Sequence, residues 1–187
     1  MLDPSRLLEV ESLLDADESL LWAGAPRQGL VLRPTDAFMV PFSILWGGFA
    51  IFWEAGVLAS GAPWFFALWG VPFVLIGLYF MIGRFFVDAR ARARTLYALT
   101  DHRAIIISGL LSKSTRSLPL RTLSDVSLIE RRDGSGTIRL GPSPPLGNWD
   151  TGLQWPGMGQ HASPAFELIP NAKQVHEQVL TAHKAAA

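Results

Sequence analysis

The chain has 187 residues, of which 49% are hydrophobic and only 17% charged, and its formal net charge is zero. It has no cysteine, which excludes disulfides, zinc–thiolate sites and cysteine nucleophiles. A composition this apolar, with so few charges, is typical of a chain that spends part of its length in a membrane.

Residues 1–36 are predicted to be a lead-in containing one short helix. Asp3 followed by Pro4 is a typical helix start, with the aspartate as N-cap and the proline as first helical residue. Three apolar residues at helical spacing then fall on one face: Leu7, Val10 and Leu14. Residues 20–22 are expected to be extended before a turn at residues 24–26.

Two long apolar stretches, residues 37–59 and 64–86, follow one another with only Ser60-Gly61-Ala62-Pro63 between them. Each is close to the ~20 residues that a helix needs to cross ~30 Å of hydrocarbon. The sequence therefore predicts a transmembrane α-helical hairpin over residues 37–87. A buried hairpin in a soluble protein is disfavoured, because Glu54 is the single charged residue of the two stretches apart from Arg84 near the end of the second.

Arginines flank the hairpin on one side, whereas its connecting turn carries no charge. They are Arg27, Arg33, Arg84, Arg90, Arg92 and Arg94. Because cytoplasmic loops collect Lys and Arg near the ends of spans, both termini are predicted to be cytoplasmic. The N-terminus is acidic and does not resemble a cleavable signal, so the first span is expected to direct its own insertion.

Residues 88–94 are predicted to be a basic juxtamembrane linker, and residues 95–187 a β-rich domain that folds by itself and ends in a helix. The expected strands lie at 97–100, 104–107, 115–120, 126–128, 138–140 and 166–168. The strongest hairpin signal is the alternation around the turn at residues 133–136. A final amphipathic helix is expected to bury Ala172, Val175, Val179 and Ala182.

Several of these segments resemble bacterial membrane proteins with a pleckstrin-homology-like (PH-like) domain. The resemblance rests on YALTDHR at residues 97–103 with the isoleucines 105–107, and on FELIPN at residues 166–171 before a helix. LWAGAP at residues 21–26 and the segment 77–85 are also similar. It implies a bent antiparallel β-barrel or sheet capped by the C-terminal helix, in an inner-membrane protein with several spans. It implies no reaction, because PH-like domains mostly bind lipids, peptides or proteins.

No catalytic arrangement is visible in the sequence. His176 and His183 share a predicted helix face, but no third ligand has matching spacing, so solvated histidines are the favoured interpretation. Gly134-Ser135-Gly136 lacks the spacing and the lysine of a phosphate loop, which favours a hairpin turn. We expect a protein that is not an enzyme and has no cofactor, no metal site and no nucleic-acid partner.

Residues of the hairpin region are candidate binding sites. The basic group Arg84, Arg90, Arg92 and Arg94 either anchors the topology or contacts anionic lipid headgroups. Glu54 lies within the first span, where it either reaches the far headgroups or meets a polar partner on another subunit. Gly70 and Gly77 share a face of the second span, which either packs the hairpin against itself or docks a partner helix. Pro72 is expected to kink that span or to free a carbonyl.

A proline-rich loop, residues 142–164, contains Trp149 and Trp155. Loops of this length in compact domains are uncommon, and tryptophans are frequent at contact surfaces. Both tryptophans are predicted to bind a partner.

These features favour an integral inner-membrane accessory or assembly subunit of a membrane protein complex, a role that the resemblance also supports through relatives that assemble photosynthetic complexes. The alternative is a membrane-anchored lipid-sensing or scaffold protein that binds anionic lipids and recruits soluble partners. A transport component is a third possibility, which two crossings support only if the chain oligomerises.

Overall fold

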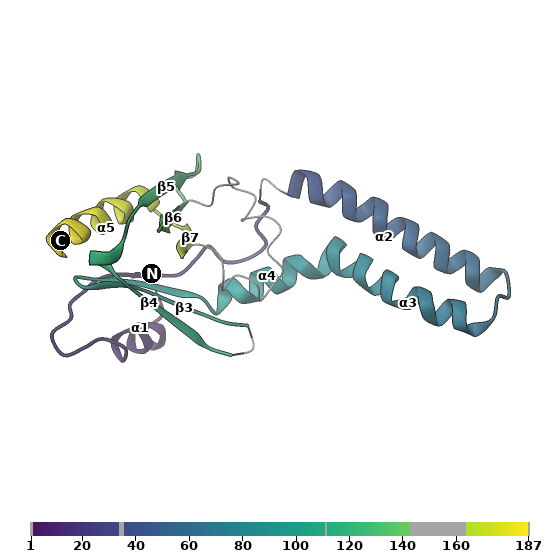
Figure 1. Ribbon diagram of the computed structural model, residues 1–187, viewed down its shortest axis with the longest axis horizontal. Coiled ribbons are helices and arrows are strands. Elements are labelled where there is room, and N and C mark those ends of the chain that lie inside the picture. Colours follow the sequence, from purple (N-terminus) through teal and green to yellow (C-terminus); the bar gives the residue numbers. More distant parts are fainter. Residues whose placement is uncertain (1, 34–35, 111, 143–163, 187) are drawn as a thin grey trace.

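The computed structural model describes residues 2–33, 36–110, 112–142 and 164–186. A helical hairpin projects from a domain built of two sheets and flanking helices (Figure 1). In chain order the elements are α1 (Pro4–Glu11), β1 (Leu20–Gly24), α2 (Asp36–Ala59), α3 (Trp64–Leu78), a π-helical turn (Tyr79–Gly83), α4 (Arg84–Ala93), β2 (Leu96–Thr100), β3 (Arg103–Ser108), β4 (Ser114–Pro119), a 3₁₀ turn (Leu120–Thr122), β5 (Val126–Glu130), β6 (Gly136–Leu140), β7 (Ala165–Ile169) and α5 (Ala172–Ala186). Helices α1 and α5 both lie at the domain end, away from the hairpin tip (Figure 1).

The hairpin helices begin where the sequence predicts. Helix α2 covers Asp36–Ala59 and α3 begins at Trp64, directly after the predicted turn. The second helix does not end at residue 86, where the second apolar stretch was predicted to end, because it continues through the π-helical turn Tyr79–Gly83 into α4. Most of the segment 88–94, predicted to be a basic juxtamembrane linker, is the last part of α4.

The surface of the hairpin is apolar and largely uncovered. The helical segments Asp36–Ala59 and Trp64–Ala93 are long and apolar enough to cross a membrane, and few of their side chains are buried in the protein. Phe52 and Leu45 are about three-quarters exposed, at 76% and 75%. Exposed apolar surface of this extent is unfavourable in water and favourable in lipid or against a partner.

Strand β1 belongs to the sheet domain although the hairpin separates it from the remaining strands. The four-stranded sheet has the order β1-β2-β3-β4, and Ala23 of β1 pairs with Ala98 of β2 in antiparallel register. The hairpin is thus inserted between two hydrogen-bonded neighbours of one sheet. Residues 20–24, predicted to belong to a lead-in separate from the domain at 95–187, therefore supply an edge strand of its sheet.

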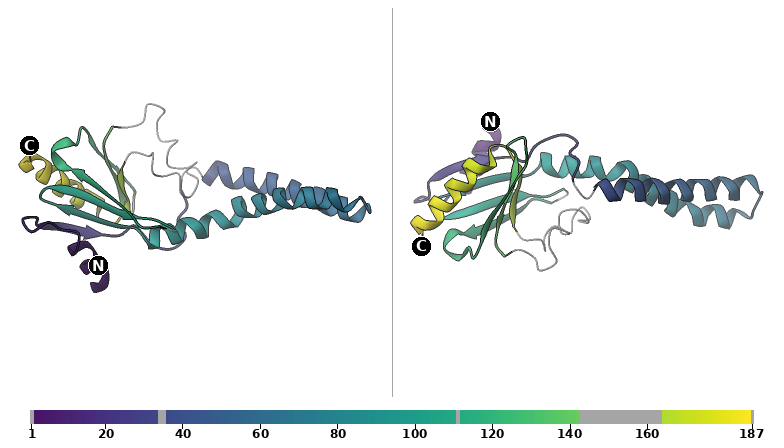
Figure 2. Two further views of the ribbon diagram at one scale, coloured as in Figure 1. Left: turned by 60° about the horizontal axis from the view of Figure 1, so that its bottom comes forward. Right: turned by 90° about the horizontal axis from the view of Figure 1, so that it is seen from above.

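Strand β2 is buried throughout because its two faces are covered by different cores. Tyr97 and Leu99 point into the main core, which also includes Phe166 and the buried face of α5. Leu96 and Ala98 point to the opposite face, where Val10 of α1 packs. The four-stranded sheet therefore lies between α1 and the α5 side of the domain (Figure 2). This burial on two faces explains why the strand is apolar at nearly every position.

The second sheet has the order β5-β6-β7 and packs against α5. The predicted hairpin is confirmed, and its register places Val126 opposite Leu140 and Leu128 opposite Ile138. The predicted helix face is also confirmed: the buried residues of α5 are Ala172, Val175, Val179 and Ala182. Within the described residues the two sheets do not close on each other, so the expected barrel is two open sheets instead.

A bidentate ion pair links the segment before β1 to strand β3. Arg103 donates from Nε and Nη2 to Glu18 at 2.9 and 2.7 Å, and Thr100 donates to the same carboxylate at 2.6 Å. The Glu18 side chain is only 1% exposed. Burial by itself raises the pKa of Glu18, but the hydrogen bonds from Arg103 and Thr100 outweigh it and hold that pKa at about 2.

This ion pair predicts a specific acid response of the full chain. Because the folded-state pKa of Glu18 lies below its ordinary value near 4.5, its contribution is complete above that pH and is lost as pH falls through about 2. Allowing for solvent screening, the contribution at neutral pH is about 2 kcal/mol. We expect Glu18→Gln to unfold more easily than the parent chain at pH 7, with the difference shrinking between pH 4.5 and 2. Unfolding in detergent by denaturant gives this difference; one that does not change with pH would contradict the assignment.

Candidate functional site

Glycines of the hairpin let its two helices approach closely. A Cβ atom added at Gly77 would lie 2.8 Å from Cα of Gly47, so backbone meets backbone at this crossing. At the next contact toward the tip, a Cβ atom on Gly70 would overlap the Glu54 carboxylate and meet the Trp53 ring at 2.7 Å. Small residues at both levels are what close packing of membrane helices needs.

In this packing the three predicted partner-binding residues of the hairpin, Glu54, Gly70 and Gly77, lie at the contact between its two helices. Gly70 and Gly77 are buried within the hairpin, so they pack it against itself rather than docking a partner helix. The Glu54 carboxyl group points inward against Gly70, not outward or toward the far headgroups. Its Oε2 atom is buried without a hydrogen-bond partner among the described residues.

A network of charged side chains, which we call the neck, joins the hairpin to the sheet domain. It consists of Arg33, Asp36, Arg84, Asp88, Arg92 and Glu167. Arg84 Nη1 lies 2.8 Å from Asp36 Oδ1, which closes the open end of the hairpin across its two helices. Arg33 Nη2 donates to Asp88 at 3.1 Å and to Glu167 of β7 at 3.3 Å. The three arginines thus face three carboxylates from four separate segments.

The neck is anchored to the domain core through Arg92 and Tyr97. Arg92 pairs with Asp88 one helical turn before it and donates from Nη2 to the Gly29 carbonyl at 2.6 Å. The Tyr97 hydroxyl accepts a hydrogen bond from the Glu167 backbone N–H at 3.1 Å. Burial raises the pKa of Tyr97, and the nearby Glu167 charge raises it further, so this phenol stays protonated at physiological pH.

The neck includes two of the four arginines predicted to contact lipid headgroups, Arg84 and Arg92. Their side chains are 16% and 5% exposed, and their guanidinium groups face carboxylates of the protein. Arg90 and Arg94 are exposed and stay available to anions. The sequence contains a signal for this pairing: Asp36 precedes the first apolar stretch and Arg84 lies near the end of the second. A hairpin brings these two positions together.

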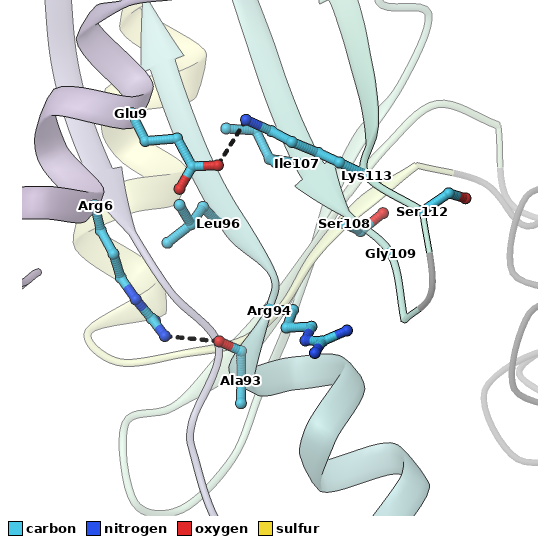
Figure 3. A pocket seen from close by; sticks show the side chains of 10 residues that line it. All are labelled: Arg6, Glu9, Ala93, Arg94, Leu96, Ile107, Ser108, Gly109, Ser112 and Lys113. Atoms are coloured by element: carbon cyan, nitrogen blue, oxygen red, sulfur yellow. Dashed lines mark hydrogen bonds and ion pairs between the residues drawn. The ribbon is translucent and has the colours of Figure 1, made fainter.

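A pocket of about 310 Å³ lies where α1, the end of α4 and the turn between β3 and β4 meet (Figure 3). Its charged lining residues are Arg6, Glu9, Arg94 and Lys113. Lys113 Nζ lies 2.7 Å from Glu9 Oε1. Arg6 donates to the Ala93 carbonyl at 2.7 Å, and Arg94 donates to the Leu110 carbonyl. The sequence analysis missed this pocket, because its residues come from three segments far apart in the chain.

Two predicted contact residues, Trp149 and Trp155, lie outside the described residues. Within the described ranges, no group of three or more His, Cys, Asp or Glu side chains is placed to hold a metal ion. His183 bonds to the Leu120 carbonyl at 2.8 Å and so serves the contact of α5 with the 3₁₀ turn.

The chain combines two sheets, a C-terminal helix and an apolar helical hairpin. The family model described as bacterial PH domain matches residues 39–183. The chain belongs to this family. The match begins inside α2 and ends inside α5, so the bacterial PH domain model includes the hairpin as well as the strands that follow it. No curated protein and no solved structure matches the chain.

Proposed function

We propose that this bacterial PH-domain protein is a non-catalytic accessory or assembly subunit of a complex in the bacterial inner membrane. The proposal rests chiefly on the exposed apolar hairpin joined to the PH domain by the neck. A protein that combines a long apolar surface with a domain of a binding family, held together by ion pairs, is suited to bridging membrane and cytoplasmic parts of one assembly. Both termini are proposed to be cytoplasmic, because the arginines cluster at the domain end of the hairpin.

Partner helices are proposed to bind the outer faces of the hairpin, since its inner face is already occupied. Large exposed side chains on these faces include Phe49, Phe52, Leu68 and Trp69. Aromatic residues of this kind commonly provide the anchors of interfaces. The loop tryptophans Trp149 and Trp155 are proposed to contact the cytoplasmic surface of the same partner.

The test is purification of the tagged full chain in a mild detergent, followed by native size analysis and identification of co-purified chains. We expect a stoichiometric complex much larger than the chain itself. Replacing both Trp149 and Trp155 by Ala should weaken the association at least about tenfold, because aromatic anchors commonly contribute ~2 kcal/mol or more. Leu8→Ala removes an exposed apolar side chain of α1, outside the hairpin, and is the control, which should leave the association intact.

Recovery of the full chain alone, in several mild detergents, would contradict the accessory role. Arg90, which is exposed on α4 next to the hairpin, favours one second candidate, a membrane-anchored lipid-sensing or scaffold protein. That candidate predicts a free protein whose recruitment of soluble partners depends on anionic lipid.

A further inference from the structure

We propose that the pocket between α1, α4 and the β3–β4 turn binds a phosphate-bearing anion, with Arg6 and Arg94 as its main ligands. The proposal does not depend on the accessory role, because it follows from the charges and hydrogen bonds of the pocket itself. Figure 3 shows these side chains arranged around one pocket, with Arg6 and Glu9 on α1 and Arg94 just after α4.

The charges of the pocket do not balance. Three cationic side chains and one carboxylate line it, which leaves two positive charges in excess. The single carboxylate, Glu9, forms an ion pair with Lys113, whose Nζ lies 2.7 Å from Glu9 Oε1. Arg6 and Arg94 each donate to a neutral backbone carbonyl instead. A guanidinium group has five N–H donors, so most donors of both arginines are available to a ligand. A guanidinium in this situation is suited to an anion with several acceptor oxygens, for which phosphate is the common biological example.

The backbone around the pocket is shaped to hold these groups in place. Gly109 has a φ of +146°, and a Cβ atom there would overlap the Ser112 carbonyl, so only glycine fits this turn. The turn places the Ser108 and Ser112 side chains on the lining beside Lys113. The serine hydroxyl groups on the lining are further donors for an anion in the pocket. The volume of about 310 Å³ lies at the small end of ligand sites and suits a compact anion.

The position of the pocket bears on the source of the anion. Helix α4 has 10 residues from Arg84 to Ala93, which is a length of ~15 Å at 1.5 Å per residue. The headgroup layer of a bilayer is only ~5–8 Å deep on each side. A pocket at the far end of α4 therefore favours a soluble phosphate compound over a lipid headgroup, while both would use the same ligands.

The test uses the full chain in nanodiscs of phosphatidylcholine, titrated calorimetrically with inorganic phosphate at constant ionic strength. We expect saturable binding, weakened at least about tenfold in the double variant Arg6→Gln/Arg94→Gln, because charge-assisted bonds are lost. Arg90→Gln removes an exposed arginine near the same end of α4 and is the matched control, which should leave the affinity unchanged. If the double variant does not fold, Arg94→Gln alone should still weaken binding, since Arg94 is exposed.

A second arm distinguishes the two sources of the anion. In nanodiscs that also contain phosphatidylglycerol, a headgroup occupying the pocket would compete and lower the affinity for phosphate, whereas a soluble ligand predicts unchanged affinity. Absence of binding by the parent chain in phosphatidylcholine discs would overturn the proposal. Equal affinity of the parent chain and the Arg6/Arg94 variants would also overturn it.

Discussion

Residues 95–187 expressed alone are expected not to form a stable domain, whereas a chain that joins residues 1–29 to residues 92–187 is expected to fold. The reason is that β1 pairs with β2 across the inserted hairpin and that α1 covers the outer face of the same sheet. Without these elements, Phe166 loses the Trp22 ring, whose centroid lies 5.6 Å away, and one face of β2 is open to water.

The junction for this joined chain is given by two hydrogen bonds. Gly29 O accepts from Arg92 Nη2 at 2.6 Å, and Gln28 Nε2 donates to Arg92 O at 3.3 Å. A flexible linker of about five residues, which reaches ~17 Å, is therefore enough to replace the hairpin.

Circular dichroism and thermal unfolding measure the outcome. The joined chain should be β-rich and unfold in one cooperative transition, while residues 95–187 should aggregate or unfold without one. Within the joined chain, Val10→Ala should be destabilising by about 1–3 kcal/mol because Val10 is fully buried, whereas Leu8→Ala on the exposed side of α1 should have little effect. Equal cooperative unfolding of both chains would show that β1 and α1 are dispensable.

The second large effect is expected in the hairpin, where Gly77→Ala should separate its two helices. The added Cβ atom would meet the Gly47 Cα at 2.8 Å, and backbone cannot move aside as a flexible side chain can. Overpacking of this kind is destabilising by about 1–3 kcal/mol. The melting temperature of the full chain in detergent should fall accordingly.

Matched glycine variants serve as controls for this effect. Gly48→Ala and Gly56→Ala place the new atom in open space and should leave the stability nearly unchanged. In Gly47→Ala the added Cβ atom meets the flexible side chain of Met81, which can move aside. This variant should therefore lower the melting temperature less than Gly77→Ala does. Equal melting temperatures for Gly77→Ala and Gly48→Ala would contradict the close crossing.

Local patterns in the sequence were sufficient to predict the elements whose determining residues are close together in the chain. The hairpin helices follow from the length of uninterrupted apolar sequence. The register of β5 with β6 follows from the alternation on both sides of one short turn, and the buried face of α5 from its helical period. In each case the residues that determine the element are close together in the chain.

Tertiary structure alone decided the rest, because it depends on partners far apart in the chain. Strand β1 is too short for its sequence to indicate which sheet it joins. Its pairing with β2 across the hairpin assigns it to the four-stranded sheet. The direction of Glu54 depends on how α2 is rotated against α3, which a symmetrical apolar surface does not encode. Arg84 and Arg92 are flanking charges in the sequence, but closure of the hairpin brings carboxylates to them. Local periodicity thus determined the elements, and long-range packing and ion pairing determined which side chains stay free to bind.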